Sequence, residues 1–240
     1  MRQNDLNSPL SFELEMHSYL QNLSSAETEL QLLSRQKAKG LGLEGICLSS
    51  WEAQILAFFI RSQPGLLRFV EVGCLTGLSA QYIFSALPAG DELWTLEKSP
   101  VHAAVARNIF AQLENKDKQI HLLEGDARDT LQKLADQLSV QPGDSESVFF
   151  DGIFIDGNKA AYGDYLHWAE KHIRPGGWIF ADNVFLSGAV WGASTAAAQK
   201  FSAKQIQVMR DFNLRLSDRS LYNSCVLPTS EGLLAAQKLF

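Results

Sequence analysis

Two short clusters of oxygen-bearing side chains stand in the second half of the sequence, and each follows an apolar segment. Asp156-Gly157-Asn158-Lys159 follows one such segment, and Asp182-Asn183 follows the next. If the segments are neighbouring parallel strands, about 4.8 Å apart, their terminal oxygen atoms can converge on one hard cation such as Mg²⁺. Asp156, Asp182 and Asn183 would be the ligands. Such a cation lowers the pKa of a bound hydroxyl group and orients its oxygen.

Lys159 stands beside this predicted cation site and is a candidate general base. A neighbouring cation and partial burial both lower the pKa of a lysine, which lets it accept a proton near neutral pH. The alternative is a solvated surface cation, which we would favour if the Asp182-Asn183 pair were missing. The sequence therefore predicts Lys159 and Asp156 as catalytic residues at a reacting hydroxyl group.

A glycine-rich turn, Glu71-Val72-Gly73-Cys74-Leu75-Thr76-Gly77, follows an earlier apolar segment. Its glycines would let the backbone approach a ligand, and the next helix would offer amide donors to a carboxylate. A dinucleotide-binding enzyme would instead carry Gly-x-Gly-x-x-Gly. Glu97, about 20 residues further on, is placed to accept hydrogen bonds from the hydroxyls of an unphosphorylated ribose. Turn and acid together predict an adenosine-type ligand; the alternative is a turn that only joins a strand to a helix.

The segments that must position these residues alternate between strand and helix character. Five short apolar segments stand at residues 66–72, 92–97, 119–125, 148–156 and 177–182, with helical stretches between them. This alternation predicts a doubly wound, mostly parallel α/β sheet of the Rossmann-like kind. Ligands of such sheets bind beyond the carboxyl ends of the strands. The acids at those ends are Glu71, Glu97, Asp126, Asp156 and Asp182.

Further elements are predicted on either side of these segments, within one domain that spans residues 1–240. Residues 1–45 form a helical N-terminal extension, with an imperfect apolar stripe from Ser11 to about Lys39. A second helix runs from Ser50 to Arg61. Residues 139–147 are a surface connection. After the fifth strand, a loop of small residues leads into a helix to about Leu216, and strands at 221–228 and 232–240 would form a closing antiparallel hairpin.

The bulk composition limits the class of function. The chain has 240 residues, of which 46% are hydrophobic, and a formal net charge of -6. The acidic balance lacks the basic footprint that nucleic-acid binding requires. Three widely spaced cysteines suggest neither a disulfide framework nor a zinc site. Because no apolar run approaches the roughly 20 residues of a membrane span and no secretory signal is evident, we expect a soluble cytoplasmic protein.

These motifs resemble the cation-dependent O-methyltransferase family, which includes caffeoyl-coenzyme A and catechol O-methyltransferases. The resemblance runs from about Ile46 to the carboxyl terminus and rests on VEVGCLTGLSA, LEKSP, EGDA, FIDGNKAAYGDYL, RPGGWIFADNVFLSGAV, MRDFN and VLPTSEG. It implies the class I methyltransferase fold and S-adenosylmethionine as the methyl donor. It also implies Mg²⁺ or another divalent cation such as Mn²⁺ or Ca²⁺, and a homodimer formed through the helical extension.

The resemblance implies a role for each matching residue. The cofactor residues would be Glu71, Gly73, Cys74 and Ser79 at the methionine part, Glu97 at the ribose, Ala127 at the adenine, and Asp156 and Asn158. The metal ligands would be Asp156, Asp182 and Asn183, with Lys159 as base and Ser187 at the acceptor. Asn158 departs from the family, since a carboxylate often contacts the cofactor there. Phe185-Leu186 departs too, where relatives with plant phenolic substrates often carry Trp.

Other aromatic side chains carry weaker signals. Trp191 could wall an aromatic acceptor or simply pack against its neighbours. Four histidines stand singly, with no nucleophile motif nearby, and are interpreted as structural: His102, His121, His167 and His172.

Three functions fit these observations. The first is methyl transfer to a hydroxyl of a small catechol-type or phenolic acceptor, with no membrane partner. The second is the same chemistry on 5-hydroxyuridine in transfer RNA, against which the acidic charge argues. The third is a non-catalytic S-adenosylmethionine-binding protein. The predicted metal ligands and base argue against this third function, because a pure binder needs no metal site.

Overall fold

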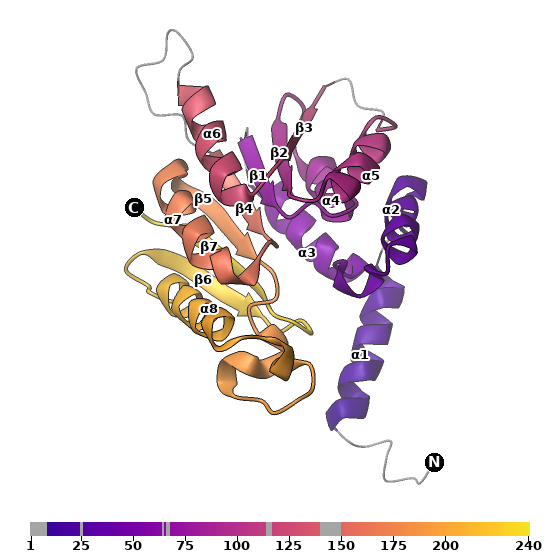
Figure 1. The fold of residues 1–240 in the computed structure, drawn as a ribbon, viewed down its shortest axis with the longest axis vertical. Helices are drawn as coiled ribbons and strands as arrows, with labels where there is room; N and C mark the ends of the chain where they lie inside the picture. Colours follow the sequence, from indigo (N-terminus) through magenta and orange to yellow (C-terminus); the bar gives the residue numbers. More distant parts are fainter. Residues whose placement is uncertain (1–8, 25, 64, 66–67, 114–116, 140–149) are drawn as a thin grey trace.

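Seven strands form a sheet at the centre of the computed structural model, which describes residues 9–24, 26–63, 65, 68–113, 117–139 and 150–240 (Figure 1). The strands are β1 (Arg68–Val72), β2 (Glu92–Glu97), β3 (Gln119–Glu124), β4 (Phe150–Ile155), β5 (Ile173–Ala181), β6 (Tyr222–Leu227) and β7 (Leu233–Lys238). They lie in the order β3-β2-β1-β4-β5-β7-β6. β1 to β5 pair in parallel, whereas β7 is antiparallel to β5 and β6. The predicted parallel sheet and its closing antiparallel hairpin are thus confirmed.

Helices cover both faces of this sheet. One face carries α3 (Ser50–Arg61), α4 (Leu78–Ala86) and α5 (Pro100–Phe110), and the other carries α6 (Ala127–Ser139), α7 (Tyr162–His172) and α8 (Ala203–Leu216). Successive side chains of a strand point to opposite faces. In β1, Phe69 therefore joins one apolar cluster while Val70 and Val72 join the other. This burial on both faces explains why the strands are nearly continuous apolar runs in the sequence.

The strand order reverses between β1 and β4, which are neighbours in the sheet although β2 and β3 separate them in the sequence. The chain leaves β1 towards α4 on one face and leaves β4 towards α7 on the other. The two loops therefore diverge at the carboxyl edge of the sheet, and a pocket lies between them. This is where an open α/β sheet binds its ligands.

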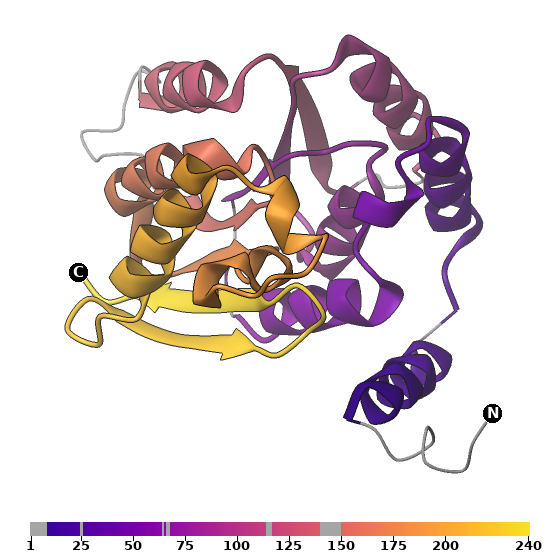
Figure 2. The ribbon, with the colours of Figure 1, turned by 60° about the horizontal axis from the view of Figure 1, so that its bottom comes forward.

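The N-terminal extension consists of α1 (Pro9–Leu23), α2 (Glu29–Gly40) and the short helix η2 (Glu44–Ile46). The sequence predicts one helical stretch over most of this region, but Thr28 begins a new helix. Its hydroxyl accepts a hydrogen bond from the Gln31 amide, and the Gln31 side chain accepts one from the Thr28 amide. α1 extends away from the rest of the protein in both ribbon views (Figures 1 and 2).

α2, in contrast, is fastened to the glycine-rich turn. The Ser34 hydroxyl donates to the Thr76 carbonyl at 3.1 Å, and the Thr76 hydroxyl donates to the Ser34 carbonyl at 3.1 Å. Gln81 of α4 donates to the Ser34 hydroxyl at 2.7 Å. All three residues are buried. The helical extension therefore supports one wall of the site.

Two boundaries differ from the sequence prediction. β5 begins at Ile173 and not near 177, because Ile173 pairs with Phe150 before the register shifts and Trp178 pairs with Gly152. The irregularity accommodates Pro175, which cannot donate to a strand ladder. The small-residue segment after β5 contains two short helices, η4 (Leu186–Trp191) and η5 (Ala198–Lys200), before α8. The surface connection predicted at 139–147 lies outside the described residues, apart from its first residue.

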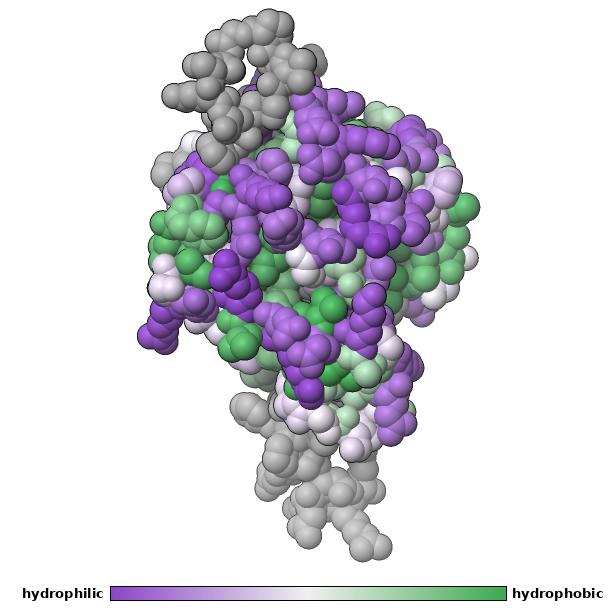
Figure 3. Space-filling view, turned by 60° about the vertical axis from the view of Figure 1, so that its left-hand side comes forward, coloured by the Kyte–Doolittle hydropathy of each residue, from purple (hydrophilic) through white to green (hydrophobic). Residues whose placement is uncertain are grey.

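The surface combines polar and apolar areas. Figure 3 shows hydrophilic residues over much of the upper part of one face, with smaller hydrophobic areas between and below them. Over the described ranges, the helices are all too short or too polar to cross a membrane.

Candidate active site

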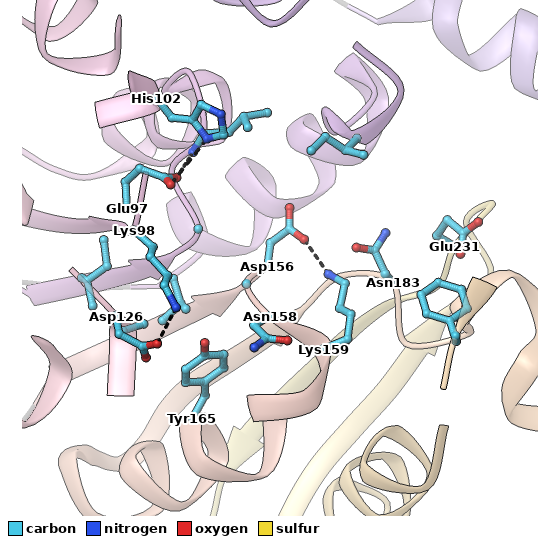
Figure 4. Close-up of a pocket in the computed structure, with 18 of the residues that line it drawn as sticks. Glu97, Lys98, His102, Asp126, Asp156, Asn158, Lys159, Tyr165, Asn183 and Glu231 are labelled. Carbon is cyan, nitrogen blue, oxygen red and sulfur yellow. Dashed lines mark hydrogen bonds and ion pairs between the residues drawn. The ribbon is translucent and has the colours of Figure 1, made fainter. Parts of the chain in front are cut away.

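A cavity of about 600 Å³ lies beyond the carboxyl ends of the parallel strands. It is lined by most of the residues that the sequence singles out: Gly73, Glu97, Ala127, Asp156, Asn158, Lys159, Asn183 and Ser187. The other predicted residues are buried and are not among the lining residues: Glu71, Cys74, Ser79 and Asp182. Figure 4 shows Asp156 near the middle, with Glu97 and Asp126 on one side and Asn183 and Glu231 on the other.

Gly73 brings the loops after β1 and β4 together. Its φ is +100°, and a Cβ atom there would overlap the backbone carbonyl of Asp156. Only glycine takes this conformation readily and leaves room for the neighbouring backbone. The sequence predicts close approach of the Gly73 backbone to a ligand; in the structure the close approach is to the backbone of Asp156. Gly73 thus allows the loop after β1 to lie against the loop after β4.

Glu97 is held by two backbone amides at the end of β2. Its Oε2 accepts from the Leu75 amide at 2.7 Å, and its Oε1 accepts from the Ser99 amide at 2.7 Å. Each carboxylate oxygen can accept a second hydrogen bond, so both remain able to bind a diol. His102 Nδ1 lies 3.5 Å from Oε1 (Figure 4). His102 also lines the cavity, so it belongs to the candidate site although the sequence suggested only a structural role.

Glu71 is a fully buried acid at the end of β1. Burial raises its pKa to about 7, although the nearby Ser79 and Thr95 hydroxyls pull the pKa down. Its Oε2 accepts from the Thr95 hydroxyl. Its Oε1 has no hydrogen-bond partner among the described residues. A buried acid with one free oxygen is suited to a cationic group such as an ammonium.

Asp126 is the strand-end acid for which the sequence suggests no required role. Its Oδ2 lies 3.0 Å from Lys98 Nζ and 3.0 Å from Arg128 Nη2, and its Oδ1 lies 3.0 Å from Arg128 Nε. The hydrogen bonds from Arg128 and Lys98 hold the pKa of Asp126 well below its ordinary value. Asp126 therefore pairs with two basic side chains, of which Lys98 lines the cavity together with Asp126 and Ala127.

Lys159 is fixed by two hydrogen bonds of its ammonium group. It donates to Asp156 Oδ1 at 2.9 Å and to the Tyr162 hydroxyl at 2.9 Å. The buried Tyr162 hydroxyl donates in turn to the Asp182 carbonyl at 2.8 Å. Asn158 begins the short helix η3 (Lys159–Ala161), and its side-chain oxygen accepts from the Ala160 amide at 3.1 Å. Its amide NH₂ group remains available to a ligand.

Burial and neighbouring charges shift the pKa values of Asp156, Lys159 and Asp182. Burial raises the pKa of Asp156, while Lys159 lowers it. Burial also raises the pKa of Asp182, and the nearby charge of Asp156 raises it further. Burial alone would lower the pKa of Lys159, but Asp156 and Tyr162 outweigh burial and hold that pKa well above its ordinary value. This direction is opposite to the lowered pKa that the sequence predicts for a lysine base beside a bound cation.

The predicted metal ligands lie at the ends of two adjacent strands, since Ile155 of β4 pairs with Ala181 of β5. Asp182 Oδ1 accepts from the Asn183 amide at 2.7 Å, and Asn183 has a left-handed backbone with φ +59°. Within the part of the chain that the structure describes, there is no group of three or more His, Cys, Asp or Glu side chains suited to a metal. Two carboxylates with raised pKa values and one amide nevertheless fit a hard divalent cation, whose charge would relieve their burial.

The cavity wall also contains residues that the sequence motifs did not assign. Ile46, Lys200, Phe201 and Glu231 line it together with Ser187. They come from η2, the segment around η5, and the turn before β7, so no local spacing connects them. For Glu231 alone a signal existed, because it lies in the quoted VLPTSEG segment. Trp191 is 64% exposed and is not a lining residue; its ring packs against Phe185.

Comparison with known proteins adds independent information. A family model described as O-methyltransferase matches residues 21–239. A catechol O-methyltransferase of Niastella koreensis is 29% identical over 209 residues, which cover 87% of this chain and 87% of that protein.

Two solved structures share the fold. The O-methyltransferase from Bacillus cereus in complex with SAH has a TM-score of 0.76 at 25% identity and covers 92% of this chain and 96% of that one. The O-methyltransferase TomG from Streptomyces achromogenes, in complex with SAM, has a TM-score of 0.76 at 25% identity and covers 100% of both chains.

Proposed function

The chain belongs to the O-methyltransferase family, and on this basis we propose that it transfers a methyl group from S-adenosylmethionine to a hydroxyl of a small catechol-type acceptor, with the help of a divalent cation. The observation that supports this function best is the division of the cavity. An acid held by backbone amides, Glu97, stands on one side of Asp156, and Lys159 with Asn183 stands on the other (Figure 4). A donor and an acceptor could therefore bind side by side.

The donor half would bind S-adenosylmethionine through features of β1 and β2. Glu97 would accept hydrogen bonds from the two ribose hydroxyls, with Ala127 beside the adenine. The free Oε1 of Glu71 would accept a hydrogen bond from the ammonium of the methionine part. The amino end of α4, which begins at Leu78, would offer amide groups to the methionine carboxylate. SAH and SAM in the two structurally similar enzymes support this choice of donor.

The acceptor half would hold a hydroxyl group and remove its proton. A divalent cation bound by Asp156, Asp182 and Asn183 would supply positive charge that lowers the pKa of the acceptor hydroxyl and of Lys159. Lys159 would take the proton, and Tyr162 fixes its ammonium by accepting a hydrogen bond at 2.9 Å. The methyl group would then pass from the sulfur of the donor to the acceptor oxygen, while the sulfur keeps the bonding electron pair.

A labelled-methyl transfer assay with Mg²⁺ tests this function. Catechols, hydroxycinnamoyl thioesters and hypomodified transfer RNA are offered in separate reactions. We expect label in the catechols, loss of transfer in excess EDTA, and recovery with Mg²⁺ or Mn²⁺. Label in transfer RNA but not in any catechol would reverse the choice of acceptor. Cofactor binding without transfer to any acceptor would support the non-catalytic alternative, and full activity in EDTA would remove the cation from the mechanism.

A homodimer and a cytoplasmic location belong to the same proposal. Tyr19 and Leu23 of α1 are 63% and 64% exposed, and Phe58 of α3 is 67% exposed. Large apolar side chains on a projecting helix favour contact with a second copy of the chain. Light scattering should give twice the 26.6 kDa mass of one chain. Replacement of Tyr19 and Leu23 by Ser should give the monomer mass, and cell fractionation tests the location.

A further inference from the structure

The loop after β5 has an unusual backbone. Three residues between 183 and 187 have left-handed conformations although none is glycine: Asn183 (φ 59°), Leu186 (φ 48°) and Ser187 (φ 51°). L-amino acids with side chains disfavour this region, and such residues persist only where their surroundings hold them. Asn183 and Ser187 both line the cavity. The conformation of this loop therefore shapes the acceptor end of the site.

Glu231 holds this loop through both oxygens of its carboxylate. The Ser187 amide donates to Oε2 at 2.8 Å, and the Ser187 hydroxyl donates to Oε1 at 2.8 Å. The two residues are 44 positions apart in the sequence. A carboxylate that accepts two hydrogen bonds from one residue restricts both the backbone and the side chain of that residue.

The turn that carries Glu231 adds two backbone hydrogen bonds to the same loop and packs closely against it. The Phe185 amide donates to the Glu231 carbonyl at 2.9 Å, and the Val184 amide donates to the Gly232 carbonyl at 3.2 Å. Gly232 has φ +79°, and a Cβ atom there would lie 2.8 Å from the ring of Phe185. The β6–β7 turn thus lies directly on the loop, and Glu231 lines the cavity on the same side of Asp156 as Asn183 (Figure 4).

We propose that Glu231 is a positioning residue that fixes Ser187 and so determines which of two adjacent hydroxyl groups of the acceptor is methylated. This inference rests on the proposed methyl transfer to a catechol-type acceptor. Either hydroxyl of a catechol can face the methyl donor if the ring turns over in the site. The wall formed by Ser187 and Glu231 contacts the rest of the acceptor, and a fixed wall favours one of the two orientations.

The ratio of the two monomethylated products is the readout, measured with an unsymmetrical catechol such as protocatechuic acid. Both products form in the same site, so their ratio does not depend on how much enzyme is folded. Glu231→Ala removes both hydrogen bonds to Ser187. We expect its product ratio to move towards one, because Ser187 then no longer has a fixed position. The KM for the acceptor should rise, while the Kd for S-adenosylmethionine stays within about twofold.

A conservative variant separates hydrogen bonding from charge. In Glu231→Gln the amide oxygen can accept from the Ser187 amide, and the NH₂ group can donate to the Ser187 hydroxyl oxygen. We expect this variant to keep the wild-type product ratio. Glu170→Ala is the matched control, because Glu170 Oε1 accepts from Tyr222 and Arg215 at 2.7 Å but does not line the cavity. It should lower thermal stability without changing the ratio.

Hydrogen–deuterium exchange of residues 183–190 gives a readout that needs no activity. We expect faster exchange in Glu231→Ala than in the wild type, and wild-type exchange in Glu231→Gln. The inference is overturned if Glu231→Ala keeps the product ratio of the wild type, whether or not its exchange rate or its melting temperature changes. A wild-type enzyme that methylates no catechol refutes the proposed function instead, while the exchange experiment still decides whether Glu231 holds the loop.

Discussion

Replacing Lys159 by Met removes the ammonium group and keeps most of the side-chain volume. The group lies 2.9 Å from Asp156 Oδ1 and 2.9 Å from the Tyr162 hydroxyl, so it is the proposed base and also the partner of a buried acid. General-base catalysis contributes about 10²–10⁴-fold in rate. This corresponds to about 3–5 kcal/mol of activation free energy, at about 1.4 kcal/mol for each factor of ten. We expect kcat to fall by that factor.

The same change should affect stability and cofactor binding much less. Asp156 loses its hydrogen bond from the Lys159 ammonium group, which should lower the free energy of unfolding by about 1–3 kcal/mol. Glu97, which would bind the ribose, has its own backbone partners and none of them is Lys159. The Kd for S-adenosylmethionine, measured by calorimetry, should therefore stay within about threefold of the wild-type value.

Lys98→Met is the matched control for this experiment. Lys98 lines the same cavity, but its ammonium pairs with Asp126 at 3.0 Å and is not held by Asp156. We expect this variant to keep kcat within about threefold. Steady-state kinetics on both variants, normalised to folded enzyme by circular dichroism, give the comparison. Equal kcat values for Lys159→Met and Lys98→Met would refute the assignment of Lys159 as base.

Three further predictions concern the donor half of the site. Glu97→Gln keeps an acceptor for the Leu75 amide but turns an NH₂ group towards the Ser99 amide, so the Kd for S-adenosylmethionine should rise about tenfold in calorimetry. Gly73→Ala places a Cβ atom against the Asp156 carbonyl at φ +100° and should lower the free energy of unfolding by about 2 kcal/mol or more, measured in urea. Glu71→Gln should unfold at a higher temperature than the wild type above pH 7 and lose this advantage towards pH 4.5, because burial raises the pKa of Glu71 from 4.5 to about 7. The folded wild type binds the Glu71 proton more tightly than the unfolded chain, so its free energy of unfolding falls by about 3 kcal/mol in total as the pH rises from 4.5 to 7. The same difference in melting temperature between the variant and the wild type at pH 5 and at pH 8 would contradict this prediction.

The alternation of strands and helices was predictable because its causes are local. Strands buried on both faces need continuous apolar residues, and the ends of β2 and α3 fall where the sequence predicts them. The break between α1 and α2 also has a local cause, because the capping box of Thr28 and Gln31 begins a new helix. The early start of β5 could not be predicted locally. The pairing of Ile173 with Phe150, across a register shift, brings the segment before Pro175 into the sheet.

The residues of the candidate site likewise divide into those that the sequence predicts and those that only the structure reveals. Asp156, Lys159, Asp182 and Asn183 could be found from the sequence, since each directly follows a strand and the ends of neighbouring parallel strands meet at one edge. His102 was missed, because a lone histidine in a helix carries no motif, although it stands in the first turn of α5 and its Nδ1 lies 3.5 Å from Glu97 Oε1. The direction of the Lys159 pKa likewise depends on the distance to Asp156 and on burial, which no spacing reveals.

The sequence by itself thus determined the parallel sheet, the strand-end acids and the candidate oxygen ligands, because hydrophobic pattern and residue type act over a few neighbouring positions. Only the tertiary structure decided that β7 lies between β5 and β6 and that the turn before it carries Glu231 to Ser187. That contact joins residues 44 positions apart, and it forms because the hairpin pairs in the antiparallel direction along β5. Such a pairing depends on the whole packed sheet, whose free energy is shared among many distant residues.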